Sequence, residues 1–163
     1  MRLQTLSSIR VALLGSVIMF LAGGSAQADG LKSLAGTWEL NVAKSRFTPG
    51  TEIRSQIRTY EIQGDEVKQS TDSVDHQGRP VHSQWVARYD GKDYPLDDNP
   101  DADTIAIKQT GELTAVTSLK KNGKVVQTVT RTLSADGKTC TFEYKGTNSK
   151  GQKIDNLLVF DRR

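Results

Sequence analysis

The sequence of 163 residues contains one cysteine, Cys140, and two histidines, His76 and His82. A single cysteine cannot form an internal disulfide, and so few thiol and imidazole groups leave little from which to build a zinc site. The sequence also lacks a Gly-x-Ser-x-Gly element and a phosphate-binding glycine loop. We therefore expect no catalytic activity, no cofactor and no bound metal.

An excess of charge of one sign is also missing. The chain has 22 Lys and Arg against 19 Asp and Glu, and residues 1–28 carry two of the arginines and no acid. Residues 29–163 therefore have a net charge of +1, with basic and acidic side chains interspersed. This pattern argues against nucleic acid as a partner, and no polybasic segment indicates binding to an anionic membrane.

The long apolar run of the chain lies at its N-terminus. Residues 11–22 are mainly apolar, follow Arg2 and Arg10, and precede the small-residue pattern Ala26-Gln27-Ala28. The pattern predicts a signal peptide, residues 1–28, that is cleaved after Ala28. The apolar run is shorter than the roughly 20 residues that span a bilayer. We expect a single domain, residues 29–163, that is periplasmic or extracellular and has no stable membrane anchor.

Short β-type runs separated by glycine-containing turns fill the rest of the chain. Turns as short as Lys121-Asn122-Gly123 join neighbouring antiparallel strands. The sequence predicts an all-β fold, an antiparallel up-and-down β-barrel of about eight to ten strands, with one further strand near Tyr94. The nine strands expected from the pattern are 37–42, 54–63, 66–75, 79–89, 104–109, 112–120, 124–133, 139–145 and 153–161.

Several positions expected to face the barrel interior carry small or polar side chains, which would leave space at the centre. Space inside a barrel is the physical argument for a ligand. These positions are Ser55, Thr59, Ser83, Ala87, Ala115, Thr117, Gln127 and Asn156.

The Gly36-Thr37-Trp38 pattern, followed by a series of β runs, resembles the lipocalin and fatty-acid-binding-protein superfamily, the calycins. The segments 40–50, 89–95 and 99–103 are more closely similar to secreted bacterial lipocalin-like proteins of uncharacterised function. The resemblance implies that Trp38 plugs one end of the barrel and that Arg162 or Arg131 packs over it. Such a role is structural.

The chain departs from the fatty-acid-binding pattern in two places. Residues 43–53 are too few for two lid helices, and the last strand lacks an inward Arg-x-Tyr pair. A fatty acid held by that pair is therefore not expected. Arg131 is in phase with Val125, Gln127 and Val129, so it could point inward and supply a substitute charge.

Aromatic residues give the best guess at a binding site. Tyr89 and Tyr94 lie near an acidic loop, and Cys140 alternates in phase with aromatic residues. We expect Cys140 to be a core residue. The aromatic residues would either line the cavity mouth or cap the core. The candidate ligand-binding residues are Trp85, Tyr89, Tyr94, Arg131, Phe142 and Tyr144.

Two alternatives concern metals. Asp97, Asn99, Asp101 and Asp103 alternate as in a calcium loop, but Ala102 at the sixth position and Lys108 at the twelfth exclude an EF-hand. An Asx-rich solvated turn accounts for them better. His76 and His82 are expected at the surface, since no third ligand lies near them in the sequence.

The leading hypothesis is a non-catalytic binding protein for a small, largely apolar molecule held in the barrel cavity. The alternative is an envelope protein–protein interaction module with a filled barrel, whose loops or strand edge engage another protein. A third, weaker hypothesis is a hydrolase or isomerase, which requires His82 or His76 to meet a carboxylate inside the cavity.

Overall fold

The computed structural model describes residues 32–163, so the expected signal peptide lies outside the described residues. Ten strands and one 3-10 helix, η1 (Val42–Lys44), make up the fold. No helix among the described residues is long and apolar enough to cross a membrane. The strands are β1 (Gly36–Leu40), β2 (Ile53–Gln63), β3 (Glu66–Asp75), β4 (Pro80–Arg88), β5 (Asp90–Pro95), β6 (Thr104–Gln109), β7 (Thr114–Lys121), β8 (Lys124–Leu133), β9 (Thr139–Thr147) and β10 (Lys153–Arg162).

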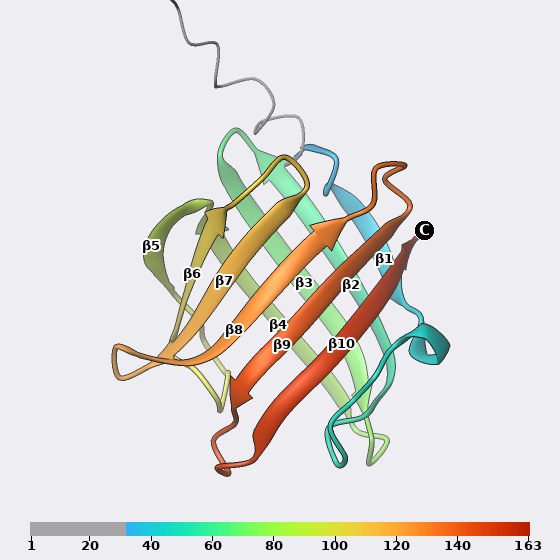
Figure 1. Ribbon diagram of the computed structural model, residues 1–163, viewed down its shortest axis with the longest axis vertical. Helices are drawn as coiled ribbons and strands as arrows, with labels where there is room; N and C mark the ends of the chain where they lie inside the picture. Colours follow the sequence, from blue (N-terminus) through green and yellow to red (C-terminus); the bar gives the residue numbers. More distant parts are fainter. Residues whose placement is uncertain (1–31) are drawn as a thin grey trace, which may run out of the picture.

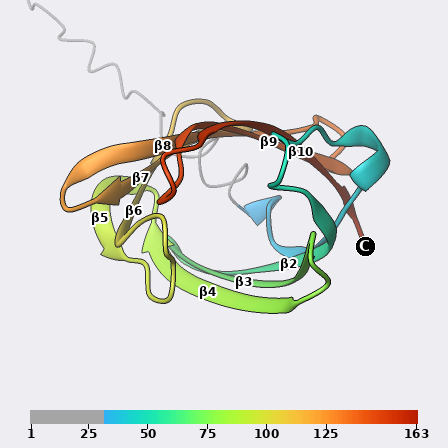
Figure 2. The same cartoon turned by 90° about the horizontal axis from the view of Figure 1, so that it is seen from below.

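All ten strands belong to one antiparallel sheet with the order β4-β3-β2-β1-β10-β9-β8-β7-β6-β5. Every neighbour in the sheet is a neighbour in the chain, except that β1 pairs with β10 and so joins the two ends of the sequence. The sheet curls until β4 faces β5, which gives a nearly closed barrel (Figures 1 and 2). The predicted fold class is confirmed, and the further strand near Tyr94 is β5.

The turn between β7 and β8 shows how the sequence sets the register of a hairpin. Asn122 and Gly123 both have positive φ, 50° and 74°, and the hairpin closes with Lys121 opposite Lys124. Two consecutive residues with positive φ define the type I′ turn, whose twist matches that of the flanking strands. Asn followed by Gly is the pair that tolerates this geometry best.

Gly146 in β9 lies against the backbone of β8. A Cβ at this position would lie 2.1 Å from the carbonyl oxygen of Val126, and φ is +150°. Only glycine fits so close a contact without displacing backbone. The pairing Gln127–Gly146 therefore depends on the absence of a side chain.

Trp38 closes one end of the barrel. Its ring is 1% exposed, and its Nε1 donates a hydrogen bond to the Leu34 carbonyl at 2.9 Å. The guanidinium carbon of Arg162 lies 4.2 Å from the Trp38 ring centre. Arg162 also donates to the carbonyl oxygens of Ala35 and Gly137, each at 2.7 Å. Of the two arginines that the resemblance offered for this position, Arg162 occupies it and Arg131 does not.

The core fills the Trp38 end and continues along the seam between β4 and β5. The largest fully buried side chains are Trp38, Phe160, Leu34, Leu133, Val67 and Cys140. A second cluster of Ala87, Ile105, Ile107 and Ala115 bridges β4 to β6 and β7. Apolar contacts from β4 to β6 and β7 therefore help to close the barrel where its two edge strands, β4 and β5, are not paired.

The strand β2 faces the interior with the opposite set of residues from that expected. Gln56, Arg58 and Tyr60 are buried, at 8, 7 and 4% exposure, whereas Ser55 is exposed and Thr59 points outward to the Thr37 hydroxyl. The alternation was ambiguous because Ile57, on the outer face, is apolar. Of the other interior positions expected, Ala87, Ala115 and Gln127 are buried.

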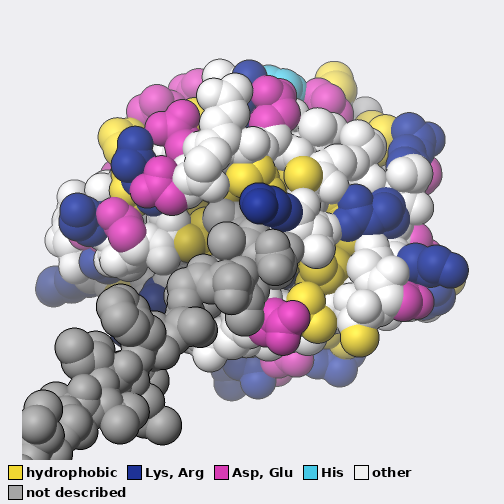
Figure 3. All heavy atoms as spheres, turned by 90° about the horizontal axis from the view of Figure 1, so that it is seen from above, with side chains coloured by type: hydrophobic (Ala, Val, Ile, Leu, Met, Phe, Trp, Pro, Cys, Tyr) yellow, Lys and Arg dark blue, Asp and Glu magenta, His cyan; other side chains and the backbone are white. Residues whose placement is uncertain are grey.

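Charged side chains of both signs are mixed on the face of the molecule seen from above (Figure 3). On this face, Lys and Arg side chains alternate with Asp and Glu side chains around small apolar patches (Figure 3). No block of one charge dominates this face, in line with the near-balanced composition of residues 29–163.

Candidate ligand-binding site

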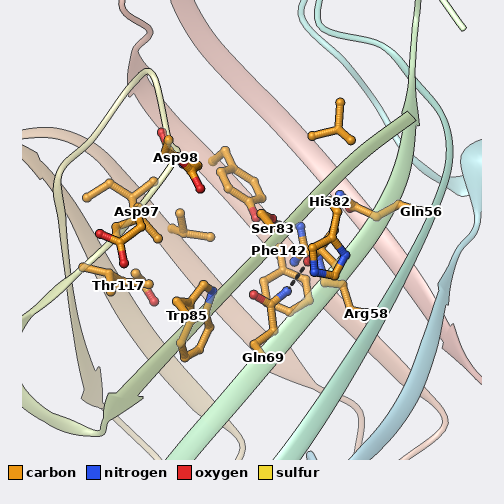
Figure 4. A pocket seen from close by; sticks show the side chains of 18 of the residues that line it. Gln56, Arg58, Gln69, His82, Ser83, Trp85, Asp97, Asp98, Thr117 and Phe142 are labelled. Atoms are coloured by element: carbon orange, nitrogen blue, oxygen red, sulfur yellow. Dashed lines mark hydrogen bonds between the residues drawn. The ribbon is translucent and has the colours of Figure 1, made fainter. Parts of the chain in front are cut away.

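A cavity of about 270 Å³ opens inside the barrel at the end opposite Trp38. Residues of β2, β3, β4, β6, β7, β8 and β9 line it, and the loop between β5 and β6 forms part of its mouth. The volume of the cavity is slightly below the roughly 300–1,000 Å³ typical of ligand pockets, so it is suited to a ligand at the small end of that class. Figure 4 shows the side chains that line it.

The deepest charged group of the cavity is the guanidinium of Arg58. This side chain is 7% exposed, and its Nη2 donates a hydrogen bond to the Tyr144 hydroxyl at 2.9 Å. Its guanidinium carbon also lies 4.6 Å from the Phe142 ring centre and 4.5 Å from that of Phe160. The two rings hold the guanidinium plane in position, since a desolvated cation–π contact contributes about 2 kcal/mol.

No acidic group within residues 32–163 neutralises Arg58. Among residues 32–163 no carboxylate forms an ion pair with it, and its Nε has no hydrogen-bond partner. Burial raises the pKa of the nearby Tyr60 hydroxyl, although Arg58 acts in the opposite direction. Tyr60 is therefore neutral at physiological pH, and the site keeps a net positive charge at depth.

Polar amides flank Arg58 on β2 and β3. Gln56 and Gln69 are 8% and 4% exposed, and both line the cavity. Gln69 donates to the Thr71 hydroxyl, while Oε1 of Gln56 is buried without a partner. Buried polar groups are nearly always hydrogen-bonded, so this end of the cavity has unused capacity for polar contacts.

Apolar side chains form the walls between this polar region and the mouth. Trp85 packs edge-to-face on Tyr60, with ring centres 6.4 Å apart. Ile105, Leu119 and Val129 continue the wall from β6, β7 and β8. The cavity therefore combines one buried positive charge with apolar sides.

The mouth carries negative charge. Asp97 and Asp98, in the loop after β5, line the cavity and are exposed to solvent. Within the described part of the chain neither carboxylate takes part in a hydrogen bond or an ion pair. Figure 4 shows both on one side of the cavity, with Gln56 and Arg58 on the other.

Three of the six candidate ligand-binding residues meet at this cavity: Trp85, Phe142 and Tyr144. The other three lie elsewhere. Tyr94 donates from its hydroxyl to Asp90 and packs on the seam cluster, and Tyr89 lies beneath Arg131. Tyr94 is not among the residues that line the cavity, because its ring packs against the seam cluster instead.

Arg131 points inward but does not line the cavity. It is 3% exposed, its guanidinium carbon lies 5.6 Å from the Tyr89 ring centre, and its three side-chain nitrogens have no hydrogen-bond partner. It lies toward the Trp38 end of the barrel, near Cys140, where burial raises the pKa of the thiol to about 11. Cys140 is therefore an unreactive core thiol. Arg131 adds a second buried positive charge, outside the cavity that Arg58 lines.

The sequence reasoning missed Arg58. The signal that could have found it is the sequence Gln56-Ile57-Arg58-Thr59-Tyr60, in which the even positions match the buried Gln69 and Thr71 across β3. Tyr60 lies on one face of this segment and Ile57 on the other, so the alternation within the strand does not show which face is buried.

The alternative sites remain without support in the described residues. His82 does meet a carboxylate, with Nδ1 2.7 Å from Asp72 Oδ1, but the two side chains are 61% and 73% exposed, and within residues 32–163 no hydroxyl or thiol is hydrogen-bonded to the ring. The loop after β5 is an Asx turn in which Asn99 Oδ1 accepts from the backbone of Asp101 and Ala102. No group of three metal-binding side chains occurs within residues 32–163.

Comparison with known proteins gives matches to solved structures only. No protein-family model matches the chain, and no curated protein matches it. A redesigned β-barrel, mFAP1, bound to DFHBI is 12% identical, with a TM-score of 0.46 over 82% of this chain and 99% of that one. The zebrafish ileal bile-acid-binding protein complexed with cholic acid is 10% identical, with a TM-score of 0.49 over 80% of this chain and 99% of that one.

The siderocalin Ex-FABP is 12% identical, with a TM-score of 0.37 over 80% of this chain and 74% of that one. The natural proteins among these matches are lipocalin-like and fatty-acid-binding-protein-like calycin barrels. Identities of 10–12% and these TM-scores carry no argument about the ligand of this chain. The chemistry of its ligand is therefore inferred from the residues that line its own cavity.

Proposed function

We propose that this protein is a non-catalytic binding protein for a small amphipathic molecule that carries an acidic group. The acid lies against Arg58, and the apolar part lies along the walls formed by Trp85 and Leu119. One observation carries the proposal: Arg58 is a buried guanidinium that lines the cavity and has no carboxylate partner.

The free energy of a buried charge explains why this observation points to an acid. A guanidinium cannot lose its proton in a protein, so Arg58 remains charged in its buried position. An isolated buried charge is unfavourable unless it is paired. A carboxylate or a similar anion supplies the missing charge and forms hydrogen bonds that are stronger than those between neutral groups.

The test is direct binding of matched probes to the purified chain. We expect decanoate to bind more tightly than decanol, with affinities measured by isothermal titration calorimetry. Ser83 lines the cavity, so the substitution Ser83→Phe fills the space and should abolish the binding of both decanoate and decanol. The matched control is Gln84→Phe, because the adjacent residue of β4 is exposed and points to the outer face.

Two results would overturn the proposal. Decanol binding as tightly as decanoate would show that Arg58 contributes nothing to recognition. Failure of both probes at millimolar concentration, with a correctly folded protein, would favour the alternative of an interaction module whose barrel takes no ligand.

A further inference from the structure

The two ends of the cavity carry opposite charge. At the inner end lies Arg58, nine-tenths buried and without an acidic partner. At the mouth lie Asp97 and Asp98, which are exposed and have no basic partner among the described residues. The apolar walls separate the two regions, so the cavity is charged at both ends and apolar between them.

We infer that the preferred ligand is bipolar, with an acidic group at Arg58 and a positively charged group at the mouth beside Asp97 and Asp98. The inference rests on the proposed function and extends it by naming the chemistry of the outer end of the ligand. A ligand with an acid alone leaves the two carboxylates of the mouth unpaired. A ligand with an amine at its far end pairs with them while its inner end keeps the contact with Arg58.

The carboxylates are available for such a contact because the rest of the loop is held by other groups. Asn99 accepts the backbone N–H groups of Asp101 and Ala102, and Asp103 accepts from the backbone of Asn122. Asp101 in turn accepts from the backbone of Ser149. The loop is thus fixed to two neighbouring turns through its polar side chains, while Asp97 and Asp98 face the cavity without a role in that fixation.

Charge at the inner end gives the ligand its orientation. The buried guanidinium would repel an ammonium group, and the two mouth carboxylates would repel a second acid. A zwitterion can therefore enter in one orientation only, acid first. A chain molecule with an acid at both ends lacks the contact with Asp97 and Asp98. One with an amine alone lacks the contact with Arg58.

The experiment compares decanoate with its ω-amino derivative, which is a zwitterion at neutral pH. We expect the native chain to bind the ω-amino acid roughly three- to tenfold more tightly, since exposed ion pairs each contribute modestly. In Asp97→Asn together with Asp98→Asn this preference should disappear while decanoate still binds. The preference should also shrink in high salt, because the mouth is exposed.

The matched control changes two exposed acids elsewhere, Glu112→Gln with Glu143→Gln, whose side chains form no contacts with the cavity. It raises the net charge of the protein by two, as the Asp97 and Asp98 variant does, and should keep the preference. An unchanged ratio of the two affinities in the Asp97 and Asp98 variant would overturn the inference and leave the proposed function standing. If neither probe binds the native chain, both fail.

Discussion

Replacing Arg58 by Met should weaken the binding of decanoate by about 10- to 100-fold and leave the binding of decanol within about twofold. Hydrogen bonds to a charged group contribute about 1.5–3 kcal/mol each, and about 1.4 kcal/mol corresponds to a factor of ten in affinity. Met has a similar length and can pack against the Phe142 and Phe160 rings that now contact the guanidinium. Calorimetric titration of both probes measures the two effects separately.

The fold should tolerate this substitution. Even a buried ion pair can often be replaced by apolar side chains of similar volume at no cost in stability, and Arg58→Met leaves no partner charge unpaired because no carboxylate of residues 32–163 pairs with Arg58. The matched control is Arg54→Met on the same strand, because Arg54 is exposed, donates to the His76 carbonyl and does not line the cavity. Equal decanoate affinity in the Arg58 variant and the native chain would show that the anion does not lie at Arg58.

Replacing Trp38 by Ala should lower the free energy of unfolding by about 3–5 kcal/mol, the range for truncating a buried aromatic side chain. The substitution empties the closed end of the barrel, leaves the Leu34 carbonyl without its donor and removes the ring beneath Arg162. Urea denaturation followed by circular dichroism measures the loss. It is a large fraction of the 5–15 kcal/mol typical of a domain.

A milder variant keeps the test informative if the Ala protein does not fold. Trp38→Phe retains an aromatic ring and loses the hydrogen bond from Nε1, so a smaller loss of about 1–3 kcal/mol is expected. Trp85→Ala is the comparison within the same chain, since Trp85 is half-buried and borders the cavity. A Trp38→Ala protein as stable as Trp85→Ala would contradict the role of Trp38 as the plug.

The sequence predicted the architecture well because the turns carry local information. Asn122-Gly123 requires one turn type, and that turn fixes which strands pair. Alternation in β9 also placed Cys140 and Phe142 correctly in the interior. Both features depend on residues next to one another in the chain.

The binding site was harder to predict because it depends on contacts between distant segments. Arg58 and Tyr144 are 86 residues apart, and nothing in either strand alone shows that they meet. The interior face of β2 is set by its pairing with β1 and β3, including an irregularity in register between Ile53 and Ser55. Tyr94 was expected either to line the cavity mouth or to cap the core, and it packs on the seam cluster, a contact that its proximity to Tyr89 in the sequence does not reveal.

The most direct test of the central claim is the pKa of the bound ligand's own carboxyl group. Decanoate labelled with ¹³C at the carboxyl carbon, titrated by NMR in complex with the protein, reports that value. Contact with the Arg58 guanidinium should hold the pKa of the bound acid below that of the free acid, and Arg58→Met should remove the effect. A bound acid whose pKa lies above that of the free acid would indicate burial among apolar groups alone, and would contradict the account.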